Sequence, residues 1–329
     1  MSPRLFTVEA PDCGLRAFIV IDSTRLGPAA GGVRTRAYAS EASALEDVHA
    51  LARAMTLKCA IAGLDAGGAK CVVMDHPGLD RPRAFAKLGA YIEDLGGLFR
   101  TAGDVGTRQE DLEAMAQHCA YVHLDETGLT DAVAMGVVAC LEGLADLDYI
   151  DPDLSTLRAT VQGCGAIGSA LARTLNRHDA TLILSDINPA SAHAVASAIG
   201  AEVCGSAAVW SQHCDVLAPC AVGGLLTAEV ASRVAASVVC GAANNILSAR
   251  DAERVLMARD VIYVPDFISS SGAVIRGISR TVMMCGDGAE RIAALRRTTR
   301  DVLELSRQDG ITATEAAIWL AESRLSVGA

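Results

Sequence analysis

Lysine is the residue type in shortest supply in this sequence. Of the 28 basic residues among 329, only Lys58, Lys70 and Lys87 are lysines, and all the others are arginines. Both types carry a positive charge, but a lysine ammonium changes its ionisation more readily when it is buried or lies beside another cation. Two of the three lysines stand in one apolar, glycine-rich stretch, 55–74. We infer that one of these two amines stays charged and that the other titrates; the alternative is that both are ordinary surface residues.

Other absences narrow the class of protein further. The 11 cysteines include no CxxC pair and lie in apolar segments, a pattern typical of free thiols in a reducing cytoplasm. No basic-then-apolar N-terminal segment and no run of 18 apolar residues is present, so we expect a cytoplasmic protein that neither spans nor binds a membrane. A net charge of -11 argues against a nucleic-acid partner. The sequence offers no metal site.

The composition predicts an ordinary globular protein. Hydrophobic residues make up 51% of the chain and charged residues 20%, which excludes extensive disorder. A length of 329 residues is sufficient for two domains with separate cores. We find no internal repeat and no low-complexity segment.

The first 130 residues alternate apolar strands, glycine turns and amphipathic helices. The patterns predict strands at 15–22, 71–74 and 121–123 and helices at 40–58, 83–95 and 107–118. Gly31 and Gly32 fall in an expected glycine-rich loop, 27–38, and a second glycine turn is expected at 62–70. Paired glycines either punctuate a turn or let the backbone approach a ligand. Asp104, between two glycines, is equally compatible with a structural turn and with a functional role.

Residues 157–186 carry the clearest local signal. A strand leads into Gly163-x-Gly165-x-x-Gly168, a helix follows, and a second strand ends at Asp186. This context is the fingerprint of a dinucleotide-binding βαβ unit, in which the glycines admit the pyrophosphate and the acidic residue binds the ribose hydroxyls. Because a carboxylate at this position repels a 2′-phosphate, the sequence favours NAD over NADP.

The alternation of strands and helices continues to the C-terminal third. We expect helices at 130–147 and 189–199, strands at 202–203 and within 214–221, 237–245 and 261–267, and a helical region over 289–326. Short apolar strands that each lead into a polar or glycine-rich loop predict a parallel sheet with its ligand-binding loops at the strand ends.

These motifs together resemble the Glu/Leu/Phe/Val amino-acid dehydrogenase superfamily, and its leucine and phenylalanine dehydrogenase branch in particular. The match runs almost end to end through LGPAAGGVRTRAYASEASALEDVHALARAMTLKCAIAGLDAGGAK, TAGDVGT, GCGAIG, SDIN, APCAVGG, GAANN and YVPDF. The resemblance implies an α/β protein with an N-terminal substrate and oligomerisation domain, a Rossmann NAD-binding domain and an active-site cleft between them. We expect the domains at 1–129 and 130–288, with C-terminal helices, 289–329, packing back onto the first.

The resemblance also implies roles for single residues. Lys58 would hold the substrate carboxylate, Lys70 would be the catalytic base, and Asp104 would move protons at the amino group. The residues implied to line the substrate site are Ala30, Gly31, Gly32 and Ser270. Those implied to bind NAD are Gly163, Gly165, Ala166, Ile167, Gly168, Asp186, Ala221, Ala243, Asn244 and Asn245.

Three positions depart from the family pattern. Ser270 stands where an asparagine usually holds the substrate main chain, within a rebuilt SSSGA loop. Val133 replaces a threonine that contacts the carboxamide, although Thr130 or Asp131 can take over that contact. Ala30 replaces a larger aliphatic residue, which would enlarge the side-chain pocket.

The expected activity is therefore the reversible, NAD-dependent oxidative deamination of a hydrophobic or aromatic L-amino acid by a homo-oligomer. One alternative is a homologue in specialised metabolism that acts on a modified amino acid or another oxo acid. The other is a catalytically idle NAD-binding protein.

Overall fold

The chain passes four times between two structural units. The computed structural model describes residues 2–327, of which 2–126, 277–286 and 321–327 form unit 1 and 127–276 and 287–320 form unit 2. The expected C-terminal segment is thus divided, with 289–320 in unit 2 and 321–327 in unit 1. Both units are built from strands and helices, which confirms the predicted two-domain α/β class.

Unit 1 contains a mixed five-stranded sheet in the order β1-β2-β4-β3-β5. Its strands are β1 (Arg4–Ala10), β2 (Leu15–Ser23), β3 (Ala29–Arg36), β4 (Gly67–Met74) and β5 (Phe99–Gly103). Strand β2 runs antiparallel to β1 and β4, whereas β3 runs parallel to both β4 and β5. The sequence patterns did not reveal β1, and the strand expected at 121–123 is a single bridge between Thr101 and Val122.

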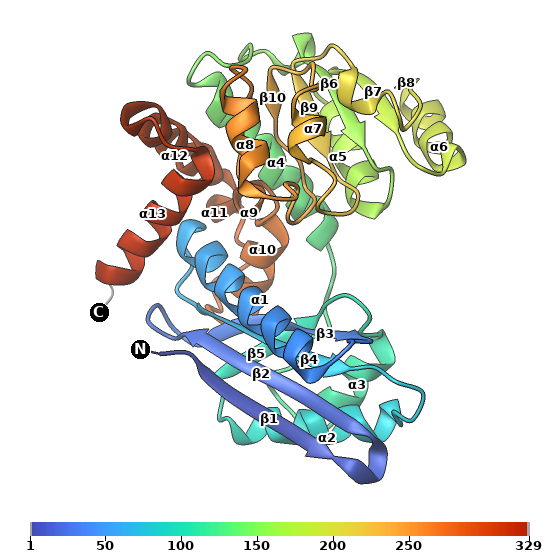
Figure 1. Cartoon of the computed structure of the whole chain (residues 1–329), viewed down its shortest axis with the longest axis vertical. Coiled ribbons are helices and arrows are strands. Elements are labelled where there is room, and N and C mark those ends of the chain that lie inside the picture. Colours follow the sequence, from blue (N-terminus) through green and yellow to red (C-terminus); the bar gives the residue numbers. More distant parts are fainter. Residues whose placement is uncertain (1, 328–329) are drawn as a thin grey trace. The chain divides into compact units, whose positions relative to one another are not determined.

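Helices cover both faces of this sheet because its strands alternate their side chains. Ile19 and Ile21 of β2 belong to the core formed with α2 (Arg81–Asp94) and α3 (Gln109–Ala116). Phe18 and Val20 point to the other face and pack with α1 (Glu41–Ile61), which crosses the sheet in Figure 1. We call this second side of the unit 1 sheet the α1 face. The three helices confirm the predictions for 40–58, 83–95 and 107–118.

The glycine-rich loop expected at 27–38 is wrong, because residues 29–36 form β3, an inner strand between β4 and β5. The glycine turn expected at 62–70 is likewise too long, since β4 already begins at Gly67. Glycine normally weakens a strand, so adjacent glycines in a sequence predict a loop more readily than a strand. Here a Cβ on Gly31 would overlap the carbonyl of Ala69. The glycines are therefore compatible with a strand whose backbone lies unusually close to its neighbours.

Unit 2 holds a six-stranded parallel sheet in the order β11-β10-β9-β6-β7-β8. Its strands are β6 (Arg158–Gln162), β7 (Thr181–Ser185), β8 (Glu202–Val203), β9 (Val216–Pro219), β10 (Val238–Val239) and β11 (Ile262–Tyr263). The chain order reverses between β6 and β9, and a dinucleotide binds at such a reversal in Rossmann sheets. The predicted parallel sheet is confirmed.

The remaining helices lie in or begin in unit 2, and Figure 1 labels them along the chain. They are α4 (Leu129–Ala145), α5 (Ala166–Asn176), α6 (Pro189–Ile199), α7 (Ala228–Ala231), α8 (Arg250–Met257), α9 (Asp266–Ser269), α10 (Gly272–Thr281), α11 (Ala289–Ala293), α12 (Leu295–Asp309) and α13 (Ala313–Val327). The helices expected at 130–147, 189–199 and 289–326 are confirmed.

Over residues 2–327, none of the helices has the length and apolar character needed to cross a bilayer. All 11 cysteines are free, as predicted.

The last turns of α13 return to unit 1, where Arg324 binds the end of α1. Its Nη1 donates to the carbonyls of Cys59 and Ala60 at 3.3 and 3.0 Å, and its Nη2 lies 3.0 Å from Asp65 Oδ1. A cation at a helix C-terminus also interacts favourably with the helix dipole. Arg324 therefore fixes the helix turn that carries Lys58.

Replacing Arg324 with methionine, which keeps the apolar stem, should lower the free energy of unfolding by about 1 kcal/mol. Urea denaturation followed by circular dichroism measures this change. Arg297→Met, at an exposed site on α12, is the control and should leave the denaturation midpoint in place. Equal midpoints for the two variants would show that the Arg324 contacts contribute nothing.

Candidate active site

The α1 face of unit 1 gathers the polar residues that the sequence singled out. Side chains alternate along a strand, so Lys70 lies on the same side of β4 as Val72, which packs with α1. On β3, Val33 belongs to the opposite core. The residues before and after Val33, Gly32 and Arg34, consequently lie on the α1 face, and so does Ala30, which is 5% exposed.

Lys58 occupies the last turn of α1. The buried stripe of this helix includes Val48, Ala52, Thr56 and Cys59, and Lys58 is half-buried at its border. A Cβ on Gly68 would overlap the backbone of Thr56, so α1 packs directly on β4 at this point. Helix α1 and strand β4 therefore bring Lys58 and Lys70 to one side of the sheet.

The pairing of β3 with β4 is interrupted opposite Lys70. The register pairs Ala30 with Gly68 and resumes only at Val33 and Cys71, so the ladder skips Gly31 and Gly32. A Cβ on Gly32 would come within 2.7 Å of the carbonyl oxygen of Gly103 and 3.0 Å of the Cβ of Asp104. Because Gly32 has no side chain, the end of β5 can approach β3. This close approach places Asp104 beside Lys70.

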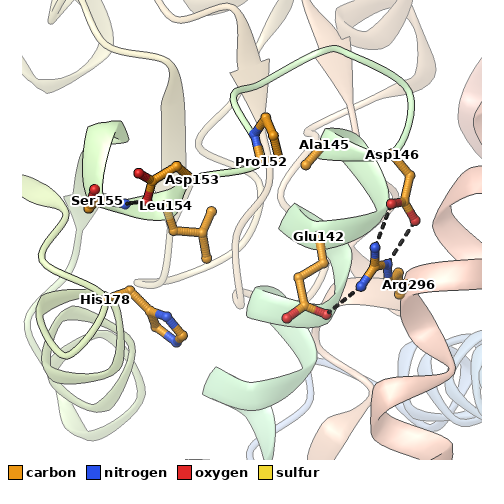
Figure 2. Close-up of a pocket in the computed structure, with 9 residues that line it drawn as sticks. All are labelled: Glu142, Ala145, Asp146, Pro152, Asp153, Leu154, Ser155, His178 and Arg296. Carbon is orange, nitrogen blue, oxygen red and sulfur yellow. Dashed lines mark hydrogen bonds and ion pairs between the residues drawn. The ribbon is translucent and has the colours of Figure 1, made fainter.

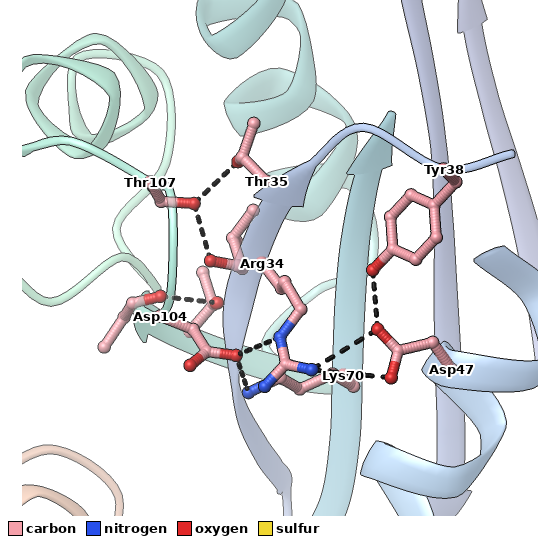
Figure 3. A network of polar contacts seen from close by, with 10 residues as sticks. Arg34, Thr35, Tyr38, Asp47, Lys70, Asp104 and Thr107 are labelled. Atoms are coloured by element: carbon pink, nitrogen blue, oxygen red, sulfur yellow. Dashed lines mark hydrogen bonds and ion pairs between the residues drawn. The ribbon is translucent and has the colours of Figure 1, made fainter. Parts of the chain in front are cut away.

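Lys70 and Asp104 form an ion pair. The ammonium Nζ lies 2.7 Å from Asp104 Oδ2, and the Lys70 side chain is 9% exposed (Figure 3). Arg34 Nε donates to the same oxygen at 3.1 Å. Burial opposes the charge on Asp104, but Lys70 and Arg34 more than offset it and hold the pKa of the Asp104 carboxyl below its usual value. Asp104 is therefore an anion at neutral pH.

The turn that presents Asp104 is fastened to β3. The backbone carbonyl of Asp104 accepts a hydrogen bond from the backbone N–H of Thr107 at 3.1 Å. The Thr107 hydroxyl donates to the Val33 carbonyl at 2.6 Å. Gly106, at φ 78°, closes the turn against Thr35, where any side chain would clash. The turn therefore holds the Asp104 carboxylate in a position where it faces two cations.

In unit 2, the fingerprint loop has the form that a pyrophosphate needs. Gly163, at φ 94°, lies against Ala221, and a Cβ on Gly168 would overlap the Gly163 carbonyl. A Cβ on Gly165 would meet nothing within 4 Å, so the space in front of this residue is open. Gly165 is the N-cap of the 11-residue helix α5, whose first backbone N–H groups point outwards for an anion. Ala166 and Ile167 form the first turn of that helix.

Asp186 directly follows β7, where the fingerprint requires it. Its Oδ2 accepts from the backbone of Cys164 at 2.7 Å, and its Oδ1 accepts from Asn188 at 2.8 Å. The two bonds fix the orientation of the carboxylate and leave lone pairs for ribose hydroxyls. The next residue, Ile187, is 91% exposed, and Val222, in the loop after β9, is 69% exposed. Both offer apolar surface along the carboxyl edge of the sheet.

The loop after β10 is held by residues that follow β11. Ala243 is buried, whereas Asn244 and Asn245 are exposed. Asn245 has a φ of 53°, a conformation that L-residues rarely adopt, and its N–H donates to Asp266 Oδ2 at 2.7 Å. Ser270, 6% exposed, donates from its hydroxyl to Asn244 Oδ1 at 3.1 Å. Ser270, an expected substrate residue, is thus joined to the expected cofactor loop.

Val133 and the two residues that can take over its expected contact, Thr130 and Asp131, differ in exposure. Val133 is buried within α4, 4% exposed, while Thr130 is half-buried and Asp131 exposed one turn earlier. Thr130 and Asp131 are therefore the more accessible of the three.

Sequence reasoning missed four residues that the geometry brings to these sites: Arg34, Ile187, Val222 and Asp266. Arg34 falls within the glycine-rich loop expected at 27–38. The sequence pattern therefore does not predict its position on strand β3. The sequence does contain a signal for Ile187. An apolar residue between an acidic residue and a turn cannot be buried in the core, so it is expected to be exposed near the ligand.

A separate pocket of about 340 Å³ lies in unit 2 (Figure 2). Asp153 and Ser155 of its lining precede β6, and His178 precedes β7, so it opens at the amino ends of the parallel strands. Arg296 pairs there with Asp146 at 2.5 Å. The fingerprint loop lies at the other edge of the sheet.

Within residues 2–327, no cluster of three or more His, Cys, Asp or Glu side chains is placed to hold a metal ion.

Comparison with known proteins identifies the family. Residues 3–121 match the dimerisation domain of Glu/Leu/Phe/Val dehydrogenases, and residues 189–280 match the glutamate/leucine/phenylalanine/valine dehydrogenase family. The chain belongs to this dehydrogenase family. Leucine dehydrogenase of Thermoactinomyces intermedius is 33% identical over 98% of the chain and 91% of its own length. Phenylalanine dehydrogenase of Bacillus thermotolerans is 35% identical over 96% and 86%.

A solved structure from the same family has a closely similar fold. The crystal structure of L-tryptophan dehydrogenase from Nostoc punctiforme superimposes with a TM-score of 0.89 at 29% identity, covering 99% of this chain and 96% of that one. The resemblance read from the motifs is thereby confirmed. Membership of this dehydrogenase family makes the protein an oxidoreductase, and its Rossmann sheet implies a nicotinamide cofactor. The matched dimerisation domain indicates a homo-oligomer.

Gly32→Ala should lower kcat/KM by about 100-fold while the protein still folds, because the new Cβ displaces Asp104 from Lys70. Steady-state kinetics and thermal melting together check this expectation. Gly205→Ala, where a Cβ meets nothing within 4 Å, is the matched control and should behave as wild type. Full activity in Gly32→Ala would show that the position of Asp104 does not matter.

Proposed function

We propose that this protein catalyses the reversible, NAD-dependent oxidative deamination of an L-amino acid with a hydrophobic or aromatic side chain. The products are the 2-oxo acid and ammonia. The observation that carries the proposal is the Lys70–Asp104 ion pair at 2.7 Å, on the sheet face covered by the helix that bears Lys58. Two cations and a carboxylate there match a substrate that carries one carboxylate and one ammonium group.

Lys58 is proposed as the anchor of the substrate carboxylate. A lysine ammonium is a compact point charge with three donors, so it can bind a carboxylate without the planar approach that arginine requires. The half-buried setting of Lys58 strengthens the attraction by excluding part of the solvent.

Lys70 and Asp104 are proposed to manage the protons. Asp104 takes a proton from the substrate ammonium, which leaves a neutral amine whose Cα–H can depart as a hydride. Loss of the hydride leaves an iminium ion. Water attacks its carbon while Lys70, acting in its neutral amine form, takes one proton from that water. Asp104 then returns a proton to the amino nitrogen of the carbinolamine. As the C–N bond breaks, ammonia leaves and the hydroxyl proton of the carbinolamine passes to the Asp104 carboxylate, which gives the 2-oxo acid.

A nicotinamide dinucleotide fits the carboxyl edge of unit 2. When bound, it supplies the ring that accepts the hydride. The first turn of α5 offers N–H groups to the pyrophosphate, and the open space at Gly165 leaves room for it. Asp186 is placed to accept from the ribose hydroxyls, and the exposed Ile187 beside it can pack against the adenine. The carboxylate of Asp186 supports NAD rather than NADP.

The substrate class is inferred from relatives and from one residue of the chain. The similar proteins are named leucine, phenylalanine and L-tryptophan dehydrogenases, all with apolar substrates. Ala30, on the same face as Lys70, has the smallest side chain that can line a pocket, which leaves room for a large apolar substituent.

A second candidate is action on a modified amino acid. It is favoured by Ser270, whose hydroxyl is engaged by Asn244 where the family pattern has an asparagine for the substrate main chain. A catalytically idle NAD-binding protein is the third possibility, and the retained Lys70–Asp104 pair argues against it.

An amino-acid panel assayed with NAD at alkaline pH tests the proposal through NADH absorbance. Lys70→Ala should lower kcat by at least about 100-fold and leave NAD binding intact, because the base is lost and unit 2 is unchanged. Lys87→Ala is the matched control, since Lys87 pairs with Asp12 at 2.6 Å on the surface. A Lys70→Ala enzyme that retained more than a tenth of wild-type kcat would exclude Lys70 as the base. If the wild-type protein turned over no amino acid, the catalytically idle NAD-binding protein would remain as the explanation.

Asp186 should make the enzyme prefer NAD, and Asp186→Ser should reduce the ratio of kcat/KM for NAD to that for NADP by about tenfold or more, because a repulsion is removed. Glu202→Gln, which removes an exposed carboxylate elsewhere in the sheet, controls for net charge. An unchanged ratio in Asp186→Ser would place the specificity elsewhere.

A further inference from the structure

Arg34 lies at the centre of the network in Figure 3, although no motif assigned it a role. Its Nε donates to Asp104 Oδ2 at 3.1 Å, and its Nη1 lies 3.3 and 3.4 Å from the two oxygens of Asp47, on α1. The Tyr38 hydroxyl donates to Asp47 Oδ2 at 2.6 Å. A single half-buried guanidinium thus joins the proposed catalytic carboxylate to a second carboxylate on the covering helix.

We propose that Arg34 is a positioning residue that fixes the carboxylate of Asp104 beside Lys70 and keeps it anionic. We further infer that Asp47 and Tyr38 hold Arg34 in the orientation that this requires. The inference deepens the proposed function and rests on it for the proton transfers that Asp104 performs. Arg34 is not proposed to touch the substrate.

The geometry of the contacts supports a positioning role. Lys70 and Arg34 both bind Oδ2 of Asp104, so the carboxylate is restrained from two directions while Oδ1 stays outside both ion pairs. Arg34 uses different nitrogens for Asp104 and Asp47, which only a planar fork can do. Oδ1 is therefore the oxygen left to exchange a proton with the substrate.

The charges of the cluster balance. Lys70 and Arg34 contribute two positive charges and Asp104 and Asp47 two negative charges, with side-chain exposures of 9–25%. At such low exposure, the loss of one charge is poorly screened by solvent. Without Arg34, the cluster would carry a net negative charge, and protonation of Asp104 would become easier.

The other ionisable groups around Asp104 leave this argument unchanged. Burial is the main cause that raises the pKa of Tyr38, and Asp47 adds to it, so Tyr38 stays a neutral donor to Asp47. Glu126 lies near Gly103, its Oε1 3.2 Å from the place of a Cβ there, and it is exposed to solvent. Lys58 stands about three turns beyond Asp47 on α1.

Two substitutions of opposite charge provide the test. In Arg34→Met, the acidic limb of the kcat/KM profile should move to higher pH by about one pH unit, because a cation that favours the anionic carboxylate is lost. In Asp47→Asn, an anion is lost and Arg34 pairs with Asp104 alone. The acidic limb of the kcat/KM profile should therefore move to lower pH. A role confined to folding would impair both variants in the same direction.

A further variant separates charge from shape. Arg34→Lys keeps the positive charge but cannot span both carboxylates, so kcat should fall about tenfold with the acidic limb near its wild-type position. Arg83→Met is the control. It removes an arginine on α2, where the guanidinium lies 2.8 Å from the exposed carboxylate of Asp12, and should leave the profile unchanged.

A titration without substrate keeps this inference distinct from the proposed function. The carboxyl ¹³C signal of Asp104, assigned with Asp104→Asn, should titrate at higher pH in Arg34→Met and at lower pH in Asp47→Asn. Identical titration of Asp104 in wild type and Arg34→Met would overturn the role of Arg34, whatever the activity. Opposite shifts in a protein that deaminates no amino acid would support the role of Arg34 and defeat the proposed function instead.

Discussion

Close approach of backbones at three glycines is the constraint on which the arrangement of unit 1 depends. Gly68 lets α1 settle on β4 at Thr56, Gly31 admits the carbonyl of Ala69, and Gly32 admits Gly103 and Asp104. Each contact closes a space that a Cβ would fill, and each brings one element of the α1 face nearer to the next. Glycine costs conformational entropy in helices and strands, so three of them in the adjacent inner strands β3 and β4 require a compensating gain. The gain is a compact polar cluster in an otherwise apolar layer.

The electrostatics of that cluster explain the unequal use of lysine and arginine. Arg34 bridges two carboxylates with different nitrogens, a task that needs a permanent charge and a planar fork. Lys70 meets one oxygen of Asp104 with a point charge and, in the proposed reaction, must also give up its proton. Lys87, by contrast, pairs with the exposed Asp12. Scarcity of lysine thus drew attention to Lys70, which lies in this cluster, but it does not distinguish Lys87, which lies on the surface.

How far the sequence predicts this protein depends on how local each signal is. The fingerprint at Gly163–Gly168 and Asp186 is a single βαβ unit, and its strands and helix occur where the pattern puts them. Strand β3 was read as a loop because Gly31 and Gly32 look like a turn when only their neighbours in sequence are considered. The carbonyl of Ala69 that requires Gly31 lies on another strand. Arg34 was missed for the same reason, since its partners Asp47 and Asp104 come from α1 and from the end of β5.

The departures from the family pattern can also be understood from the contacts they make. The resemblance to the family implies that Ser270 lies beside the substrate, but its hydroxyl donates to Asn244. Asp266 in turn holds the left-handed backbone of Asn245. Ser269 donates to the carbonyl of Gly241 at 2.6 Å, in the same loop after β10. Two of the serines in the rebuilt SSSGA segment thus act on the loop expected to lie along the cofactor. A substitution at Ser270 would remove or alter its hydrogen bond to Asn244, so a change made there for the substrate also affects the loop expected to bind the cofactor.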